Sequence, residues 1–581
     1  MTPATLDFRN PNSLWCSVLV ETLVRLGLRQ VVISPGSRST PLTIAFVRHP
    51  SIEAIPVLDE RSAAFFALGL AKQRGIPVAL VCTSGTAGAN YFPAIIEAHE
   101  SGVPLLVLTA DRPPELRDCH SGQTIDQQKL YGDYVNFYHE LAVPEAKLEL
   151  LRYLRQTVAH AYAMSVRSAH GPVHLNCPFR DPLPPVARPM PAGMAAPAFA
   201  DFFAGLEEAG WQQVPLGDPI GPKLADEPNG VIVVGPNDPV DSQLFAQSIG
   251  RLSRALGWPV MADALSPVRM HAAEAGHVVA HYDAILRSEK LANALRPKRV
   301  ICIGAWPTSK VLRAWLQESD PETVMVTDRA GNLDALHLRT GFIREGLPGW
   351  SIGFSGKKRL SACAKRWLTA DRAAAEALNA GLSRAKGFVE PACVPTLARH
   401  LPEATTLFVA SSMPVRDMEY FWPLGTGRQR VKFNRGANGI DGTLSTALGV
   451  AHGDRLPAVL LTGDLALLHD TNGFLSVPKF RGSLTIVLIN NNGGGIFGHL
   501  PVAQFDPPFE EFFATPQEAD FSKLCTAYGV AHTLVKSMAQ LGRLVRKLPQ
   551  RGVRVLELRT DRKKDAAFRK ALFAAVAAAL E

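Results

Sequence analysis

The sequence predicts an α/β protein built from doubly wound parallel sheets, and three observations support this. Short runs rich in Val, Ile and Leu recur along the chain and are almost continuously apolar, as in strands that are covered on both faces. Helical segments separate the runs, which is the order that parallel strands require. Many runs end in Ser, Thr, Asp, Asn or Gly, at the strand ends where open α/β sheets place their ligands.

The predicted strands follow one another along the whole chain. They are VVISP from Val31, VALVC from Val78, LLVLTAD from Leu105, VHLNCP from Val173, VIVVGP from Val231, VICIGA from Val300, VMVTD from Val324, LFVASS from Leu407, VLLTGD from Val459, IVLINNN from Ile486 and VLELRTD from Val555.

The chain has 581 residues, which exceeds the size at which a single hydrophobic core stops growing, so we expect several domains. The stretch from Asp181 to Phe199 carries six prolines and few strong apolar anchors, which predicts an extended linker. A softer boundary is expected between Gly381 and Pro395. The sequence therefore predicts three α/β domains of similar size, over residues 1–185, 200–380 and 390–581.

The composition excludes several classes of protein. Charged residues make up 20% of the chain and no apolar run of about 18 residues occurs, so we expect no membrane span. The first residues lack a basic start and an apolar core, which favours the cytoplasm. Eight cysteines are scattered without a C-x-x-C pair, which argues against a disulfide framework or a zinc site. The net charge of +8 is dispersed, so small anionic ligands fit it better than nucleic acid.

The clearest candidate for chemistry lies at the ends of two predicted strands of the third domain. Gly-Asp occurs four times, but only Asp464 has partners at a distance, because Asn491 ends the next strongly apolar run 27 residues later. The spacing predicts that a carboxylate, an amide oxygen and the backbone carbonyl of Gly493 meet there. Such hard oxygen ligands suit Mg²⁺, which takes its remaining ligands from phosphates and water. Gly494 and Gly495 would let backbone approach a phosphate, although a simple turn is the alternative.

This G-D-L…N-N-N-G-G pattern resembles the diphosphate-binding motif of thiamine-diphosphate enzymes. The resemblance implies thiamine diphosphate as cofactor, with Mg²⁺ or Mn²⁺ bound by Asp464, Asn491 and Gly493. It also implies a homodimer or homotetramer, since that family builds its active site between two chains. The cofactor-binding positions that it implies are Glu60, Ile440, Gly463, Asp464, Leu465, Asn491, Gly493, Gly494 and Ile496.

The resemblance also requires the first domain to supply a carboxylate that contacts the aminopyrimidine ring of the cofactor, and Glu60 is the candidate. It ends an extended stretch and opens a strongly apolar helix in LDERSAAFFALGLAK, a setting that removes water from the carboxyl group. By similarity Glu60 is the catalytic residue that exchanges a proton with the ring. The alternative is an acid that caps the helix and is stabilised by its dipole.

Several long strings are similar to one branch of this family, the synthases that join 2-oxoglutarate to isochorismate in menaquinone biosynthesis. They are SPGSRSTPL from Ser34, TSGTAGANYFPAIIEA from Thr83, LTADRPPELRDC from Leu108 with the GQTIDQ that follows, RGANGIDGTLSTALG from Arg435 and NNNGGGIFGHLP from Asn490. The resemblance implies a transferase that decarboxylates 2-oxoglutarate and adds the succinyl carbanion to isochorismate.

Both substrates are multiply anionic, so arginine, lysine and amide donors are expected around them. Ile440 resembles the aliphatic wedge that bends the cofactor, and Ile496 and Phe497 would wall the reactive carbon. Lys310 is the weakest assignment, because its string AWPTSKVLRAW matches only loosely. The substrate-binding positions implied by the resemblance are Ser37, Arg38, Arg112, Gln123, Lys310, Arg416, Arg435 and Phe497.

Other functions fit the sequence less well. The nearest alternative is another thiamine-diphosphate enzyme, such as an acetolactate-synthase-like carboligase or a 2-oxoacid decarboxylase. The chain lacks an adjacent His-His pair of the pyruvate decarboxylase kind, and its arginine-bearing strings favour a dicarboxylate pocket. A non-catalytic cofactor-binding protein is disfavoured because Glu60 and Asp464 are both present. A nicotinamide enzyme is disfavoured because no G-x-G-x-x-G follows a strand with an acid about 20 residues later.

Overall fold

The computed structural model describes residues 5–166, 170–191, 194–199, 201–204, 206, 227–329, 333–336, 338–385, 387–425 and 427–581. The contacts divide the chain into two compact units. Unit 1 contains Met1–Gln212, Asn434–Leu456 and His469–Gly482, and unit 2 contains Gln213–Phe433, Pro457–Leu468 and Ser483–Glu581. The three domains expected at residues 1–185, 200–380 and 390–581 stay a prediction.

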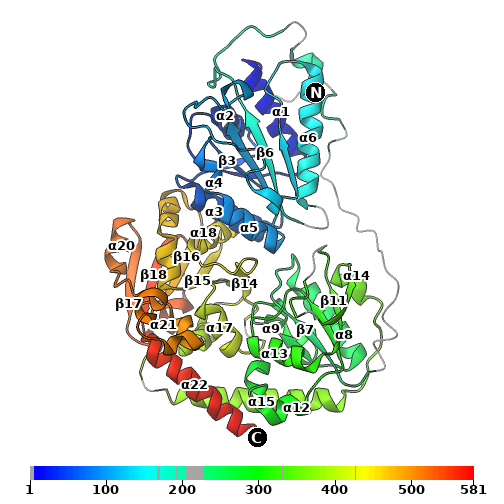
Figure 1. The fold of residues 1–581 in the computed structure, drawn as a ribbon, viewed down its shortest axis with the longest axis vertical. Coiled ribbons are helices and arrows are strands. Elements are labelled where there is room, and N and C mark those ends of the chain that lie inside the picture. Colours follow the sequence, from blue (N-terminus) through cyan, green and yellow to red (C-terminus); the bar gives the residue numbers. More distant parts are fainter. Residues whose placement is uncertain are drawn as a thin grey trace. The chain divides into compact units, whose positions relative to one another are not determined.

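The strands of the described residues form three six-stranded sheets in which every pairing is parallel (Figure 1), so the predicted fold class is confirmed. The first sheet contains β1 (Gln30–Ile33), β2 (Glu53–Pro56), β3 (Val78–Cys82), β4 (Leu105–Asp111), β5 (Phe137–Glu140) and β6 (Pro172–Pro178). The second contains β7 (Gly230–Val234), β8 (Val260–Ala262), β9 (Val278–Val279), β10 (Arg299–Ile303), β11 (Glu322–Val326) and β12 (Arg339–Ile343). The third contains β13 (Thr406–Val409), β14 (Arg430–Phe433), β15 (Pro457–Gly463), β16 (Ser483–Asn490), β17 (Ala531–Val535) and β18 (Gly552–Arg559).

The first and third sheets share one topology. Their strand orders are β2-β1-β3-β4-β6-β5 and β14-β13-β15-β16-β18-β17, whereas the second sheet has the order β12-β11-β10-β7-β8-β9. In the first and third sheets the chain reverses direction across the sheet between the first and third strands, β1 and β3 or β13 and β15. Open α/β sheets bind ligands beside such a switch point, beyond the carboxyl ends of the strands. The topology therefore predicts ligand sites in the loops that follow these four strands.

Helices connect the strands of both units. In unit 1 they are α1 (Pro11–Arg25), α2 (Thr40–Arg48), α3 (Glu60–Arg74), α4 (Thr86–Ala89), α5 (Phe92–Ser101), α6 (Leu148–Val166) and α18 (Thr443–Asp454). In unit 2 they are α8 (Ser242–Leu256), α9 (Pro267–Met270), α10 (Ala272–Ala275), α11 (Tyr282–Ile285), α12 (Glu289–Ala294), α13 (Lys310–Ser319), α14 (Leu347–Ser351), α15 (Ala362–Ser383), α16 (Cys393–His400), α17 (Met413–Phe421), α20 (Phe521–Ala527), α21 (Met538–Arg546) and α22 (Arg562–Ala579). The short helix α19 (Asp464–His469) follows β15.

Two helices of unit 1 approach each other so closely that their contact requires glycine. A Cβ atom on Gly69 of α3 would lie 2.1 Å from the carbonyl oxygen of Thr446 on α18. A Cβ atom on Gly449 of α18 would lie equally close, 2.1 Å from the carbonyl oxygen of Phe66. Real Cβ atoms do not approach backbone oxygen at such distances, so any side chain here would separate the helices. The pair therefore fixes the helix that begins with Glu60 against the helix that follows the predicted cofactor wedge.

The last part of the proline-rich stretch is anchored rather than free. Phe199, in the short 3-10 helix Ala196–Phe199, is fully buried in the core of unit 1, and Phe202 and Phe203 beside it are also buried. Earlier in the stretch, the Asn10 side chain donates to the carbonyl oxygen of Val186 (3.0 Å). Hydrogen bonds and aromatic burial thus attach residues beyond 185 to the first sheet.

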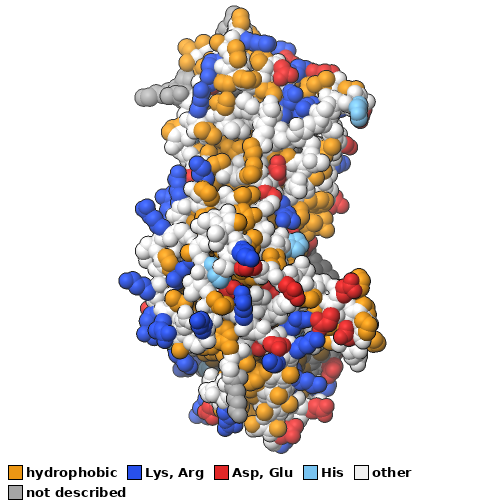
Figure 2. Space-filling model, turned by 90° about the vertical axis from the view of Figure 1, so that its left-hand side faces the viewer, with side chains coloured by type: hydrophobic (Ala, Val, Ile, Leu, Met, Phe, Trp, Pro, Cys, Tyr) orange, Lys and Arg blue, Asp and Glu red, His pale blue; other side chains and the backbone are white. Residues whose placement is uncertain are grey.

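The surface carries charges of both signs. On the face drawn in Figure 2, Lys and Arg side chains lie among acidic, polar and apolar ones. Charges of both signs therefore occur on this face. Within the described ranges, we find no helix whose length and hydropathy would allow it to span a bilayer.

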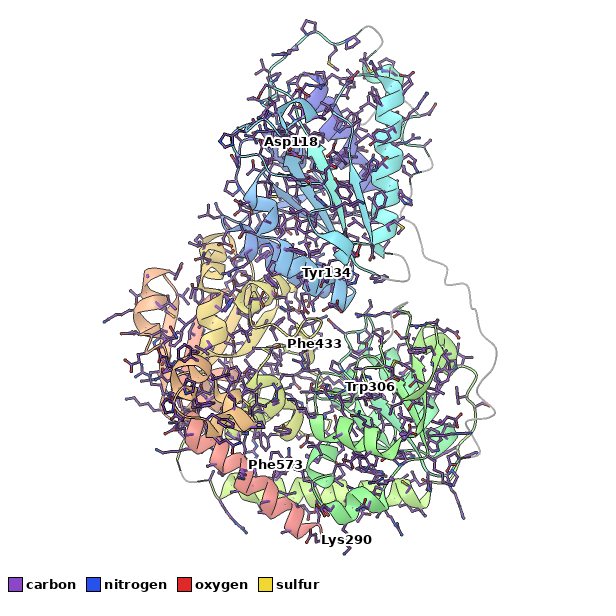
Figure 3. All side chains as sticks on the ribbon, viewed as in Figure 1. Asp118, Tyr134, Lys290, Trp306, Phe433 and Phe573 are labelled. Atoms are coloured by element: carbon purple, nitrogen blue, oxygen red, sulfur yellow. The ribbon has the colours of Figure 1, made fainter. Side chains whose placement is uncertain are left out.

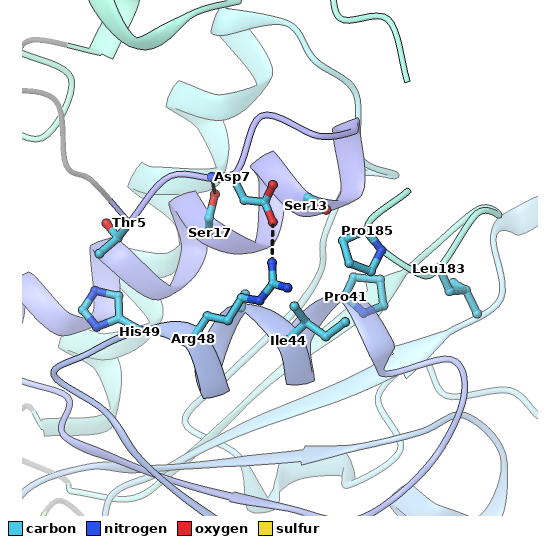
Figure 4. Close-up of a pocket in the computed structure, with 11 residues that line it drawn as sticks. Thr5, Asp7, Ser13, Ser17, Pro41, Ile44, Arg48, His49, Leu183 and Pro185 are labelled. Atoms are coloured by element: carbon cyan, nitrogen blue, oxygen red, sulfur yellow. Dashed lines mark hydrogen bonds and ion pairs between the residues drawn. The ribbon is translucent and has the colours of Figure 1, made fainter. Parts of the chain in front are cut away.

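A buried carboxylate joins α1 to the end of α2. Glu21 accepts a hydrogen bond from the Thr5 hydroxyl (2.6 Å) and lies 3.2 Å from Nε2 of His49. Nearby, Asp7 and Arg48 form an ion pair of 3.6 Å (Figure 4). Burial of Glu21 opposes its ionisation, but the bonds from His49 and Thr5 outweigh it and lower the pKa of Glu21 to about 2.

We expect Glu21→Gln to be less stable than the unchanged protein at neutral pH, by about 1–2 kcal/mol, because the ionised form is the one that the fold stabilises. A depressed pKa contributes stability above the unfolded value of 4.5, and this contribution is lost as the pH falls from 4.5 towards 2. Urea unfolding at pH 7, 4.5 and 3 measures the difference. A difference that stayed constant over this range would contradict the assignment.

Candidate functional site

The ends of β15 and β16 form the first part of the candidate site. The two strands pair in parallel up to Gly463 and Ile489, so the residues that follow them emerge at the same edge of the sheet. Asp464 follows β15 and is 5% exposed. Its carboxylate accepts hydrogen bonds from the backbone N–H groups of Gly493 (2.7 Å) and Leu465 (2.9 Å). The structure therefore brings the predicted carboxylate against the predicted glycine loop.

Asn491 presents an oxygen atom that needs a partner. Its side chain is buried, and its Oδ1 accepts no hydrogen bond from the described residues. An unsatisfied buried acceptor costs about 1–3 kcal/mol. Burial also raises the pKa of Asp464 to about 6, while the N–H groups of Gly493 and Leu465 act in the opposite direction, so the carboxylate is ionised at neutral pH. A divalent cation would satisfy both oxygens, and the residues therefore fit Mg²⁺.

The backbone around this edge depends on glycine. Gly493 has a φ of +131°, and a Cβ atom there would lie 2.3 Å from the carbonyl oxygen of Ala514. A Cβ atom on Gly494 would lie 2.6 Å from the ring of Phe497. At Gly463, by contrast, a Cβ atom would meet no described atom within 4 Å, which indicates open space beside the strand end. The loop can thus place its backbone close to a bound phosphate group.

Ile496 and Phe497 follow the glycines in the short 3-10 helix η6 (Gly495–His499). Both side chains are half-buried. The ring of Phe497 packs edge-on against Phe513, with the ring centroids 6.0 Å apart. This contact fixes the ring of Phe497, one of the two apolar side chains that the resemblance places at the reacting carbon.

Two predicted cationic residues of unit 2 have different surroundings. Arg416, on α17, is half-buried, and its guanidinium donates to the carbonyl oxygen of Ser412 (2.6 Å). Burial, together with the charge of Arg313 on α13, lowers the pKa of Arg416. Lys310 is the first residue of α13 and is exposed. The structure thus places Arg313, which the motifs did not single out, near Arg416.

Three predicted substrate residues of unit 1 converge on the loop after β3. A guanidinium N–H of Arg112 donates to the Ser84 hydroxyl, and the side-chain amide of Gln123 donates to the carbonyl oxygen of Ser84 (3.0 Å). The backbone N–H of Arg38 donates to the Thr83 hydroxyl (3.3 Å). Burial and the charge of Arg38 lower the pKa of Arg112. Two guanidinium groups so close that one lowers the pKa of the other are suited to bind an anion.

Ser37 lies one residue before Arg38, in the loop between β1 and α2, and is exposed. The guanidinium of Arg38 donates to the carbonyl oxygen of Phe179 (2.9 Å), just beyond the end of β6. The loops that follow β1, β3, β4 and β6 therefore meet at one edge of the first sheet. This edge is the switch point that the topology indicates.

Glu60 is the first residue of α3, in agreement with the sequence prediction, and is half-buried. The residue that caps this helix is Asp59, whose carboxylate accepts the N–H of Ser62 (2.8 Å) and a hydrogen bond from Asn472 (2.8 Å). The alternative in which Glu60 is the capping acid is therefore wrong. Glu60 is the acidic residue in the first turn of the helix, next to this cap.

The loop that carries Arg435 and Ile440 begins just after Phe433, the end of β14 (Figure 3). The buried carboxylate of Glu97 on α5 accepts the backbone N–H of Gly436 (3.1 Å) and that of Ala437 (2.8 Å). Two hydrogen bonds from neighbouring N–H groups to one carboxylate hold this part of the loop rigidly. Nothing in the motif pointed to Glu97, because a single acid in an apolar helix looks like an ordinary surface residue.

Comparison with known proteins assigns these features to a family. Three family models match in order: the N-terminal TPP binding domain of thiamine pyrophosphate enzymes at residues 16–130, the middle domain at residues 225–409, and the C-terminal TPP binding domain at residues 416–558. Thiamine pyrophosphate is the same compound as thiamine diphosphate. The predicted cofactor class is confirmed.

Similar proteins named 2-succinyl-5-enolpyruvyl-6-hydroxy-3-cyclohexene-1-carboxylate synthase cover nearly the whole chain. Those of Gloeothece citriformis and Nostoc sp. are 50% identical to it over 572 and 574 residues, and that of Trichormus variabilis is 51% identical over 572. Each alignment spans 97% of this chain and 98% of the relative. The chain belongs to this synthase family. It is a thiamine-diphosphate-dependent enzyme that forms carbon–carbon bonds.

Solved structures show the same fold at much lower identity. Benzoylformate decarboxylase of Polynucleobacter necessarius has a TM-score of 0.70 at 16% identity, and covers 94% of this synthase-family chain and 98% of its own. The 4-hydroxybenzoylformate decarboxylase of Rhodococcus jostii has a TM-score of 0.69, also at 16% identity, with 94% and 99% covered. These similarities extend the agreement in fold but do not bear on the substrate.

Proposed function

We propose that this protein decarboxylates 2-oxoglutarate and adds the remaining four-carbon succinyl unit to isochorismate, which yields 2-succinyl-5-enolpyruvyl-6-hydroxy-3-cyclohexene-1-carboxylate and CO₂. The observation that carries the proposal is the identity of about half of all residues to synthases of this name over 97% of the chain. The loop edge of the first sheet supports it, because two adjacent arginines suit a dianionic substrate.

The residues at the end of the third sheet are the proposed cofactor and metal site. Asp464, Asn491 and the carbonyl oxygen of Gly493 would bind Mg²⁺ or Mn²⁺, since both metals accept an oxygen ligand set. The open space at Gly463 and the N–H-rich loop up to Gly494 would receive the diphosphate. When bound, thiamine diphosphate accepts the electron pair that remains after CO₂ leaves a 2-oxoacid. The positions proposed beside its rings are Leu465, Ile440 and Ile496.

The proposed role of Glu60 is to hold and exchange a proton with the aminopyrimidine ring. A positioned acid or base of this kind contributes typically about 10²–10⁴-fold to a rate. Its place at the start of α3 supports the proposal, because Asp59 supplies the helix cap and the helix behind Glu60 is apolar and buried. Bound cofactor would supply the electron sink for the loss of CO₂, and the addition to isochorismate would also take up one proton at the carbon beside its ring carboxylate.

The proposed substrate contacts come from two groups of side chains. Those of unit 1 are Ser37, Arg38, Arg112, Gln123 and Arg435, and those of unit 2 are Lys310, Arg416 and Phe497. Charge-assisted hydrogen bonds from arginine to a carboxylate are strong and directional, so these residues would both attract and orient the two anionic substrates. Rejection of pyruvate follows if the second carboxylate is needed to pair the arginines.

The proposed assembly is a homodimer or homotetramer with active sites shared between chains, on the pattern of the thiamine-diphosphate enzymes. The proposed location is the cytoplasm. All eight cysteines are free thiols, which is the state that reducing compartments maintain. Light scattering coupled to size-exclusion chromatography measures the assembly, and a monomer that is fully active would contradict the shared site.

The proposed reaction is tested by the ultraviolet loss of isochorismate in the presence of thiamine diphosphate, Mg²⁺ and 2-oxoglutarate, with pyruvate in a parallel sample. The expected result is consumption of isochorismate that depends on 2-oxoglutarate and does not occur with pyruvate. Release of CO₂ from pyruvate with isochorismate unchanged would contradict the proposal and favour a decarboxylase.

We expect Arg112→Gln to raise the KM of at least one substrate by about 10–100-fold, because a hydrogen bond to a charged group is worth about 1.5–3 kcal/mol. The turnover number should change less, since the substitution leaves the cofactor site intact. Initial rates over a range of each substrate separate the two constants. Arg152→Gln, an exposed arginine on α6, is the control. Equal KM values in the two variants would remove Arg112 from the substrate site.

A further inference from the structure

One peptide unit in the loop after β3 is held from both of its sides by glutamine side chains. The peptide joins Ser84 to Gly85, and in a trans peptide the C=O and N–H groups point in opposite directions. The C=O of Ser84 accepts the side-chain amide of Gln123 (3.0 Å). The N–H of Gly85 donates to Oε1 of Gln127 (2.8 Å). The orientation of this peptide plane therefore links the two glutamines.

The side chain of Gln127 is only 1% exposed, and both its oxygen and its amide group form hydrogen bonds. Besides accepting from Gly85, its side-chain amide donates to the carbonyl oxygen of Ala110 (3.2 Å) and to Oδ1 of Asn176 (2.9 Å). These partners lie on the central strands β4 and β6. Gln127 thus attaches the segment around Gln123, which has no helix or strand of its own, to the rigid centre of the first sheet.

The network continues from Asn176 to the backbone of Arg112. Asn176 is fully buried, and its side-chain amide donates to Oδ2 of Asp111 (2.8 Å) and to Glu140 (3.2 Å). The other oxygen of Asp111 accepts the backbone N–H of Arg112 (2.7 Å). A guanidinium N–H of Arg112 in turn donates to the Ser84 hydroxyl. The chain of bonds closes a ring around the loop, and every hydrogen-bonding group of the Asn176 amide is used.

We propose that Gln127 is a positioning residue that acts through the Ser84–Gly85 peptide to hold Gln123 and Arg112 in their substrate-binding positions. The inference rests on the proposed function, because it takes those two residues as substrate contacts. Without the acceptor at Gln127 the peptide plane is free to rotate, and the C=O that holds the Gln123 amide rotates with it. Gly85, with a φ of +82°, has no side chain, so steric resistance to this rotation is small.

The alternative is that Gln127 only fills a polar place in the core. In that case its loss would lower the stability and the active fraction of the protein but leave the KM of the active molecules unchanged. A positioning role instead predicts a raised KM, with little change in the turnover number per active site. The two roles are therefore distinguished by the constants and not by the rate alone.

The test compares Gln127→Met with Gln128→Met in the full-length holoenzyme. Gln128 is the neighbouring glutamine; it is exposed and makes one long contact with Glu140 (3.4 Å), so it is a matched control. We expect Gln127→Met to raise the KM of at least one of the two substrates about tenfold, the effect of losing one well-placed hydrogen bond, with the turnover number changed less than about threefold. Gln127→Glu keeps the acceptor for Gly85 and should restore part of the affinity.

Hydrogen exchange of the substrate-free protein gives an independent readout. We expect faster exchange of the peptides that contain Gly85 and Gln123 in Gln127→Met than in Gln128→Met, while strands β4 and β6 keep their protection. If exchange is faster in Gln127→Met but the unchanged protein turns over neither substrate, the positioning of the loop is upheld and only the proposed function is overturned. Unchanged exchange and unchanged KM values for both substrates in Gln127→Met would overturn the inference.

Discussion

Glu60→Gln lowers the turnover number for isochorismate consumption by roughly 10²–10⁴-fold, while the affinity for thiamine diphosphate changes far less. Glutamine has nearly the size of glutamate but cannot exchange a proton at neutral pH. Helix α3 should remain intact, because Asp59 provides its cap. Steady-state rates at saturating cofactor, together with calorimetric titration of thiamine diphosphate, measure the two quantities.

Glu149→Gln is the matched control, since Glu149 lies in the first turn of α6 in the same unit and is exposed. Its turnover number should equal that of the unchanged protein. A Glu60→Gln variant with more than about a tenth of the normal turnover would show that the proton exchange does not pass through this residue.

Asp464→Asn has the second large effect, which is the loss of metal-dependent cofactor binding. The substitution removes the only formal charge among the three proposed ligands. Loss of a residue that only hydrogen-bonds to a metal ligand typically lowers metal affinity about 10–100-fold, so the affinity for Mg²⁺ should fall by at least this much. Calorimetric titration of Mg²⁺ in the presence of thiamine diphosphate measures the change. Asp133→Asn is the control, because Asp133 also follows a glycine but is exposed.

The same substitution should act in the opposite direction on the stability of the metal-free protein. Burial raises the pKa of Asp464 to about 6 from 3.8, so the folded state binds the proton more tightly than the unfolded state. The metal-free protein therefore loses stability as the pH rises from about 4 to 6, and above this range Asp464→Asn should be more stable by about 1–2 kcal/mol. Lower stability of Asp464→Asn at pH 7.5, in the presence of a chelator, would contradict the conclusion that burial destabilises the ionised carboxylate of Asp464.

The sequence predicted the four central strands of the first and third sheets and missed their edge strands; in the second sheet it also missed the interior strand β8. Each of the eleven apolar runs became a strand, because strands covered on both faces must be apolar throughout. The strands that were not predicted include β2, β5, β14 and β17, which are the outermost strands of the first and third sheets. Their residues are only partly buried, so their sequences carry no continuous apolar signal.

The contact between the two halves of the proposed metal site could be predicted, because the residues lie in one motif with a fixed spacing. The structure brought Asp464 against Gly493, as the positions at adjacent strand ends required. Glu97, Gln127 and Arg313 could not be predicted in this way. Their contacts are to backbone groups or neighbouring charges that only the folded chain brings near them, and a buried glutamine or glutamate leaves no periodic pattern in the sequence.

The central claim is that one enzyme removes CO₂ from 2-oxoglutarate and transfers the remaining four carbons to isochorismate. Incubation with 2-oxoglutarate carrying ¹³C only in the carboxyl group next to the ketone, followed by mass spectrometry of the gas and of the organic product, tests this directly. The account predicts labelled CO₂ and an unlabelled succinyl-cyclohexene product in equal amounts. Labelled CO₂ without consumption of isochorismate, or a product that retains the label, would contradict it.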